Sequence, residues 1–272
     1  MRLLWLSCLG LGLGPGCGGP AVRPAPDSIA TEAQAPTQAE GDATAADLPQ
    51  WTRRWGKLLD RSVSSQTGRV NYARLRRQRG ELDALVKALA SKRQFANRRQ
   101  KLAFLINAYN VLVFAEVVAH PPVTSVRRID GFLSERRCQL LGQKHSLNAI
   151  RDELIRPMAD PRALLAINHA ALGSAPLRNR PYTAEGLDSE LDEQCRRFVN
   201  DPLYNTQVSG QALLSPLFQW FDQDFAIEPY GGTLAFIARY AHPRSSIGRL
   251  LRSFEQPPVI YLEFNWSLNG AD

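Results

Sequence analysis

The sequence predicts an α+β fold, in the form of a helix-rich single domain with a small mixed or antiparallel sheet. After residue 50, most apolar side chains recur at the three- and four-residue spacing of amphipathic helices. Runs typical of strands are fewer and too scattered for regular βαβ winding. The chain has 272 residues and is 44% hydrophobic, so it can bury a core and is not disordered throughout.

The part of the chain after residue 50, called the body below, begins with segments of helical spacing. Apolar residues predict helices over 51–59, 82–89 and 101–120, and a break at 66–69 ends the first of them. The segment 101–120 is almost entirely apolar and stops before Pro121. Its internal polar residues indicate a buried core helix rather than a membrane span.

The middle of the body alternates between predicted strands and helices. Residues 138–146 are typical of a short hairpin, and the helix that follows is expected to end at Pro157. The apolar run 163–168 is bounded by polar residues and predicts a buried strand. A helix is then expected over 184–200.

The C-terminal part predicts a second hairpin over 206–214, with a turn at Gly210. Ser215 is expected to cap a short helix, and Thr233 a longer one. The alternation over 259–264 predicts a final strand.

The N-terminal 17 residues have the layout of a secretory signal. Arg2 precedes an apolar run over 3–13, and small residues follow it up to Cys17. The run is about half of the ~20 residues that a spanning helix needs. A Cys directly after small residues resembles the bacterial lipoprotein signal, in which that Cys carries the lipid. Because Gly14 stands where this signal prefers Leu, ordinary secretion is the alternative.

Residues 18–50 are rich in Ala, Pro, Thr and Gln and contain no aromatic residue. Such a composition predicts a flexible tether between the anchor and a domain over 51–272. Gly18, rather than Asp, follows Cys17, which by the same resemblance favours the outer membrane over the inner. We therefore expect an exported protein, lipid-anchored at the outer membrane or in the periplasm, with secretion as the alternative.

Several short motifs recur in a fixed order along the body, and together they resemble the domain of unknown function 547 family. The most specific are Ile106-Asn-Ala-Tyr-Asn110 and the distant Trp266-Ser-Leu-Asn269. The others are Asp160-Pro-Arg162, Ala166-Ile-Asn168, Pro176-Leu177 and Tyr182-Thr-Ala-Glu-Gly-Leu-Asp188. The resemblance covers essentially the whole body of the chain.

The resemblance implies a papain-like fold and a Cys, a His and an Asp, which together would form a thiol hydrolase site. The matching positions here are Ser174, Asp152 and Asn265, and His169 stands where the family has a second Cys. A serine hydroxyl needs a strong base, whereas Asp152 has an ordinary pKa of about 3.9 and Asn265 cannot support an imidazolium. His169 is a substitute base by position, although a locally satisfied histidine is the commoner role.

The other candidate residues are polar groups inside the apolar segment 101–120. Asn107, Tyr109 and Asn110 are candidates for lining a pocket, with Tyr109 the best of them. Buried polar groups of this kind more often serve structure through hydrogen bonds.

Charge and cysteine placement exclude several classes. Residues 18–50 carry a net charge of −4, whereas 51–272 hold 31 basic and 21 acidic residues. The basic clusters lack the interleaved aromatics of a nucleic-acid platform. Anionic lipid head groups, cell-wall polymers or an envelope protein are the expected partners. No spacing suits a metal or cofactor, and the sequence leaves open whether Cys138 and Cys195 pair.

These observations favour a non-catalytic binding or scaffolding domain of the cell envelope that retains the fold and lost the chemistry. Two alternatives stay open: a thiol- or serine-type hydrolase of peptide or amide bonds, and a purely structural envelope protein.

We predict that Cys17→Ala releases the protein from membranes, because the substitution removes the thioether site for the lipid. Membrane fractionation and N-terminal mass spectrometry measure the outcome. Cys8→Ala is the matched control, since Cys8 leaves with the signal. Unchanged fractionation of Cys17→Ala, with an unlipidated N-terminus in the wild type, would contradict the lipoprotein assignment.

Overall fold

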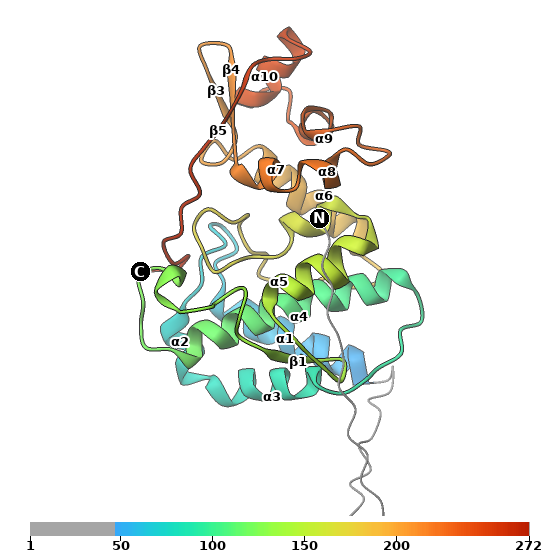
Figure 1. Cartoon of the computed structure of the whole chain (residues 1–272), viewed down its shortest axis with the longest axis vertical. Coiled ribbons are helices and arrows are strands. Elements are labelled where there is room, and N and C mark those ends of the chain that lie inside the picture. Colours follow the sequence, from blue (N-terminus) through green and yellow to red (C-terminus); the bar gives the residue numbers. More distant parts are fainter. Residues whose placement is uncertain (1–46, 272) are drawn as a thin grey trace, which may run out of the picture. The chain divides into compact units, whose positions relative to one another are not determined.

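The computed structural model describes residues 47–271, and helices dominate this part of the chain (Figure 1). The predicted signal, Cys17 and almost all of the tether lie outside the described residues. The helices are α1 (Leu48–Ser62), α2 (Tyr72–Arg77), α3 (Arg79–Leu89), α4 (Arg98–Ala119), α5 (Leu147–Ala149), α6 (Leu187–Val199), α7 (Pro216–Trp220), α8 (Asp222–Phe225), α9 (Thr233–Tyr240) and α10 (Ser246–Ser253). Shorter 3₁₀ or π segments are η2 (Val126–Arg128), η3 (Ile150–Ile155), η4 (Arg156–Met158) and η5 (Pro161–Leu165).

Two small sheets complete the described part. Strands β1 (Cys138–Leu140) and β2 (Gln143–His145) form an antiparallel pair. In the second sheet, β4 (Gln211–Leu214) lies between β3 (Thr206–Val208), which is antiparallel to it, and β5 (Val259–Tyr261), which is parallel. The predicted α+β class with a small mixed or antiparallel sheet is confirmed.

The long helix α4 is the centre of the core. Asn97 caps it by accepting from the Gln100 N–H at 2.9 Å. It is long and apolar enough to cross a membrane, but 83% of its most apolar window is already buried by protein. Trp51 and Trp55 of α1 pack against Phe104 and Phe114 of α4, with ring centroids 5.5 and 5.4 Å apart. Its burial therefore fits the predicted core helix.

Both hairpins form where the sequence predicts them. Between β3 and β4, Ser209 and Gly210 have φ angles of 50° and 79°, the pair of positive values that a tight type I′ turn requires. The side chain of Ser215 accepts from the Leu217 N–H at 3.3 Å and so caps α7 as expected. Thr233 does not cap α9; its hydroxyl donates to Asp222 Oδ1 at 3.0 Å instead.

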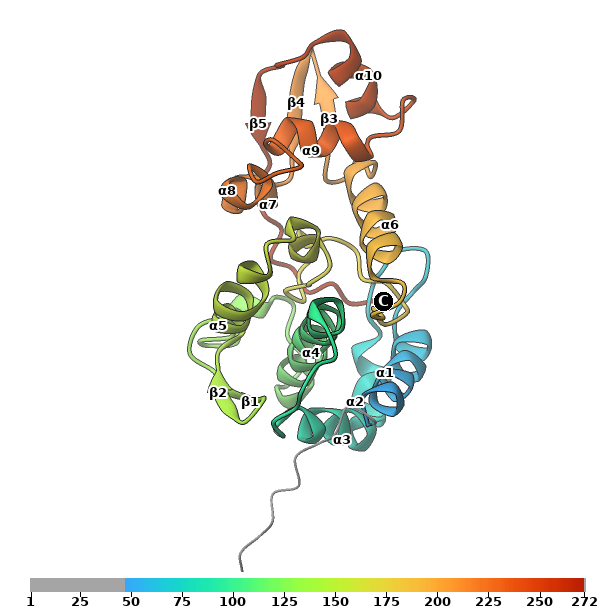
Figure 2. The same ribbon diagram turned by 90° about the vertical axis from the view of Figure 1, so that its right-hand side faces the viewer.

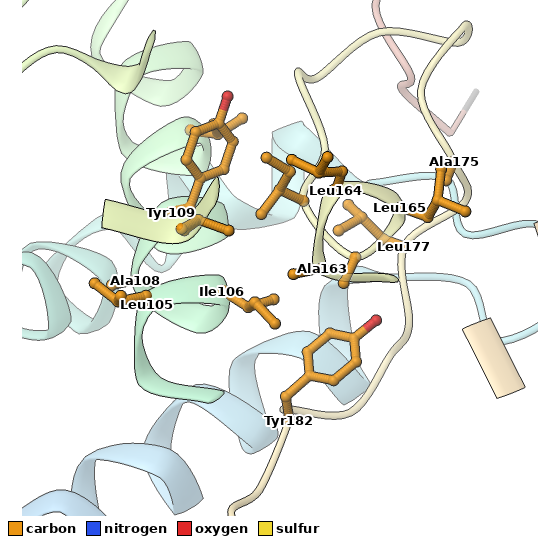
Figure 3. Close-up of a cluster of buried hydrophobic side chains, with 14 of the residues drawn as sticks. Leu105, Ile106, Ala108, Tyr109, Ala163, Leu164, Leu165, Ala175, Leu177 and Tyr182 are labelled. Carbon is orange, nitrogen blue, oxygen red and sulfur yellow. The ribbon is translucent and has the colours of Figure 1, made fainter. Parts of the chain in front are cut away.

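The buried strand predicted over 163–168 is wrong. Residues 166–168 form an irregular loop, and residues 163–165 belong to the 3₁₀ helix η5, which Asp160 caps by accepting from the Arg162 N–H at 3.2 Å. Pro161 starts it, because proline has a helix-compatible φ and no N–H to satisfy. Figure 3 shows Leu164 and Leu165 of η5 beside Ile106 and Tyr109 of α4. Because the segment is buried against α4, it is a continuous apolar run like that of a buried strand. The spacing of apolar residues cannot distinguish a short buried helix from such a strand.

Buried asparagines attach the loop after η5 to its surroundings. Asn110 of α4 accepts from the Asn168 N–H at 2.9 Å and donates to Ala166 O at 3.0 Å. Asn168 Oδ1 in turn accepts from Asn269 Nδ2 at 3.0 Å, and Asn269 Oδ1 accepts from the Tyr72 hydroxyl at 2.7 Å. These amides supply the hydrogen bonds that an irregular buried loop cannot make with itself.

We predict that Asn110→Ala lowers the free energy of unfolding by about 2–4 kcal/mol, because it leaves one N–H and one C=O buried without a partner. Chemical denaturation at neutral pH measures the change. Asn179→Ala is the control, since Asn179 makes no side-chain hydrogen bond among the described residues, and should cost no more than about 0.5 kcal/mol. Equal losses in the two variants would contradict a special role for Asn110.

Candidate functional site

A cavity of about 480 Å³ lies among three segments that are distant in sequence. One wall is the loop 66–69, a second is the loop 171–176 with the end of α6, and a third is the C-terminal segment 262–269. Its lining residues are Gln66, Thr67, Gly68, Arg69, Asn168, Ala171, Leu172, Gly173, Ser174, Pro176, Arg197, Asp201, Leu203, Tyr204, Ser215, Pro216, Leu262, Glu263, Asn265 and Asn269.

The C-terminal segment closes the site by backbone pairing. After β5 it runs away from the second sheet, and Gly270 pairs with Val70, just before α2 (Figures 1 and 2). The Gly173 N–H donates to Asn265 O at 2.8 Å, and the Val70 N–H donates to Asn269 O at 3.0 Å. A Cβ at position 173 would lie 2.7 Å from the Asn265 nitrogen, so only glycine allows this approach.

Ser174 and His169 are in contact, as their positions on one loop allowed. Ser174 is 1% exposed, and its Oγ accepts from the His169 backbone N–H at 3.1 Å. The same Oγ lies 3.3 Å from His169 Nδ1. In the tautomer that carries the imidazole proton on Nε2, Nδ1 accepts the hydroxyl proton, which has no other acceptor among the described residues.

The imidazole of His169 is enclosed. Its ring lies edge-on between Tyr109 and Phe264, with centroids 6.1 and 6.4 Å away. Nε2 is buried and has no hydrogen-bond partner in the described part. Burial, and next the charge of Arg151, lower the pKa of His169 to about 3, while Asp152 acts weakly in the other direction. The ring is therefore neutral at pH 7 and is a weak base.

Asp152 belongs to an ion-pair cluster rather than to a catalytic relay. It lies on the π-helical segment η3, where Arg151 binds both of its carboxylate oxygens at 2.8 and 2.7 Å. Arg156, itself paired with Asp224, adds a contact at 3.4 Å. Burial raises the pKa of Asp152, but the bonds and charges of the two arginines outweigh it and lower the pKa overall. Asp152 therefore affects the pKa of His169 through its charge alone and makes no hydrogen bond to it.

Asn265 lines the same cavity as Ser174. Its Oδ1 accepts from the Ser267 N–H at 3.0 Å, so a hydrogen bond within the C-terminal segment orients its amide group. Of the four family-matched positions, Ser174 and Asn265 thus line one cavity. His169 is buried in contact with Ser174, and Asp152 lies in a separate ion-pair cluster.

The three pocket candidates of α4 do not line the cavity. Asn107 accepts from the Tyr182 N–H at 3.0 Å and donates to Tyr182 O at 2.7 Å, and Asn110 is bonded to the loop after η5. Tyr109 is fully buried, its hydroxyl has no partner among residues 47–271, and burial raises its pKa. The contacts of the two asparagines are structural.

Several residues that line the cavity were not predicted from the sequence. Arg69 precedes α2, Arg197 belongs to α6, and Asp201 and Tyr204 lie in the turn after α6; these residues share no motif. Asn168 and Asn269 lie inside the motifs that carry the family resemblance, but the motifs alone assign them no role. Within 47–271 no group of three or more His, Cys, Asp or Glu side chains is placed for a metal ion. Both described cysteines are buried and unpaired.

Residues 93–199 match the model of the family described as "Protein of unknown function, DUF547", so the predicted resemblance to this family is confirmed over that segment. The matched region contains α4, η3 and the loop with His169 and Ser174. Asn265 and the Trp-Ser-Leu-Asn ending lie outside it. No curated protein and no solved structure matches the chain.

We predict that His169 destabilises the fold in acid. Below pH 6.5 the unfolded state takes up a proton on this histidine, whereas the folded state does so only near pH 3. The free energy of unfolding therefore falls with decreasing pH in this window, by up to about 1.4 kcal/mol per pH unit from this group. In His169→Asn the slope between pH 6.5 and 4.5 should be shallower, as measured by denaturation at several pH values. His242→Asn is an exposed control. Identical slopes in wild type and His169→Asn would contradict burial of a neutral ring.

Proposed function

We propose that this domain binds a small ligand in the 480 Å³ cavity without transforming it, as an exported module of the cell envelope. The volume lies in the range of small-molecule sites, which combine apolar walls with a few placed polar groups. Buried Asn168, Ser174 and Asn269 supply such groups here. A purely structural protein needs no such cavity.

The observation that carries a non-catalytic role is the state of His169. Activating a serine requires a base whose pKa is near the working pH and a carboxylate that stabilises the imidazolium. Burial and Arg151 lower the pKa of His169 to about 3, and no carboxylate within residues 47–271 bonds its Nε2. Proton transfer from Ser174 would thus create a buried, uncompensated charge, which is costly.

A serine-type hydrolase of peptide or amide bonds is the second candidate. The 3.3 Å contact between Ser174 Oγ and His169 Nδ1, at the wall of an accessible cavity, favours it. Contacts tighten when substrate binds in some enzymes, so the reactivity of Ser174 is the property that separates the two candidates.

The envelope location rests on the signal and on the charge of the body. A lipid on Cys17 would hold the domain at a membrane, and the excess of basic residues in 51–272 suits anionic head groups or cell-wall polymers. An envelope protein partner is the alternative, and the surface charge gives no reason to invoke nucleic acid.

We predict that a fluorophosphonate probe does not label Ser174, because no base generates the alkoxide. Intact-mass spectrometry of wild type and Ser174→Ala measures labelling, with a known serine hydrolase as positive control. A fragment screen followed by amide chemical shifts should, in contrast, give shifts at Asn168 and Ser174. Stoichiometric labelling that Ser174→Ala abolishes would establish the hydrolase, and fragments that shift no cavity residue would contradict binding.

A further inference from the structure

Two arginines line the cavity without a carboxylate partner in the described part of the chain. Arg197 of α6 donates to Leu177 O at 3.1 Å and to Gln66 O at 2.8 Å, so carbonyl oxygens hold its guanidinium in place. Arg69 is exposed, and its side chain makes no hydrogen bond to residues 47–271. By comparison, Arg162 and Arg178 are each paired with acidic side chains. A guanidinium carries five N–H donors, so both cavity arginines keep donors free.

The buried amides of the cavity also have donors left over. Asn168 uses one N–H of Nδ2 on Ala175 O at 2.9 Å, and Asn269 uses one on Asn168 Oδ1 at 3.0 Å. Their oxygens are already occupied, by the Ala170 N–H at 2.7 Å and the Tyr72 hydroxyl at 2.7 Å. Each amide has two N–H donors. What each offers a ligand is therefore a second N–H, at a side chain that is 2% or 4% exposed.

Three charged residues of the cavity, Arg69, Arg197 and Asp201, act on Tyr204, whose hydroxyl donates to Leu172 O at 3.1 Å. Burial raises the pKa of Tyr204 and Asp201 adds to the rise, whereas Arg197 and Arg69 oppose it. The two cations and one anion thus act on the same point. Glu263 also lines the cavity, so its lining holds two arginines and two carboxylates, and the two arginines are its only cationic side chains among the described residues.

From these donors we infer that the ligand of the cavity carries a carboxylate, bound by Arg69 and Arg197 with the spare amide N–H groups of Asn168 and Asn269. A planar guanidinium matches a carboxylate through paired charge-assisted hydrogen bonds. Asp201 and Glu263 also line the cavity and would repel a doubly charged phosphate more strongly than a singly charged carboxylate. This inference rests on the proposed binding function.

The test uses acetate and acetamide, which have the same shape and differ in charge, with inorganic phosphate as a third probe. All are titrated into the full-length protein at constant ionic strength set by sodium chloride, and amide chemical shifts of Asn168 and Ser174 report cavity binding. Acetate should bind more tightly than acetamide and phosphate. Arg197→Gln should weaken acetate about tenfold, the effect of losing one charged hydrogen bond.

Two further variants make the result decisive. Arg196→Gln removes the same charge from the neighbouring position, which does not line the cavity, and should leave acetate binding unchanged. Arg69→Gln alters an exposed side chain and keeps the test valid if Arg197→Gln fails to fold. Acetamide binding as tightly as acetate, tighter binding of phosphate, or equal acetate affinity in Arg69→Gln and Arg196→Gln would overturn the carboxylate assignment while the binding function stands. A cavity that no probe or fragment shifts would overturn both.

Discussion

The buried amide network of Asn110, Asn168 and Asn269 is the interaction on which the rest of the site depends. It joins a core helix, an irregular loop and the C-terminal segment, three parts that share no regular secondary structure. Because each amide both donates and accepts, the network replaces the ladder that a sheet would provide at this junction. Loosening it would at once unpair buried groups and move the walls of the cavity.

Elements with a strong local pattern could be predicted from the sequence. Helix α4 and the two hairpins depend on apolar spacing and turn residues that lie close together in the chain. The 163–168 run was assigned wrongly because burial on all sides gives the same apolar run to a strand and to a 3₁₀ helix. Pro161 and the contacts with α4 determine that residues 163–165 are helical, and the spacing of apolar residues carries no information on those contacts.

The site was predictable only in part, for a related reason. His169 and Ser174 are five residues apart, so their contact could be anticipated from one loop. Arg69, Arg197 and Asn269 meet because of how the chain folds back, and no spacing records that. The burial that makes the pKa of His169 so low is likewise a property of the surrounding rings, Tyr109 and Phe264, rather than of the histidine's own sequence neighbours.

The return of the C-terminal segment also dictates an order of assembly. Tyr72 and Asn269, which bond to each other, are 197 positions apart, and contacts of such long range form late in folding. During synthesis the helices around α4 can pack while the third wall of the cavity is still unmade. The cavity is complete only when the chain has been made as far as Asn269, so a nascent chain, or one shortened before this segment, would hold a core and a pocket that lacks its third wall.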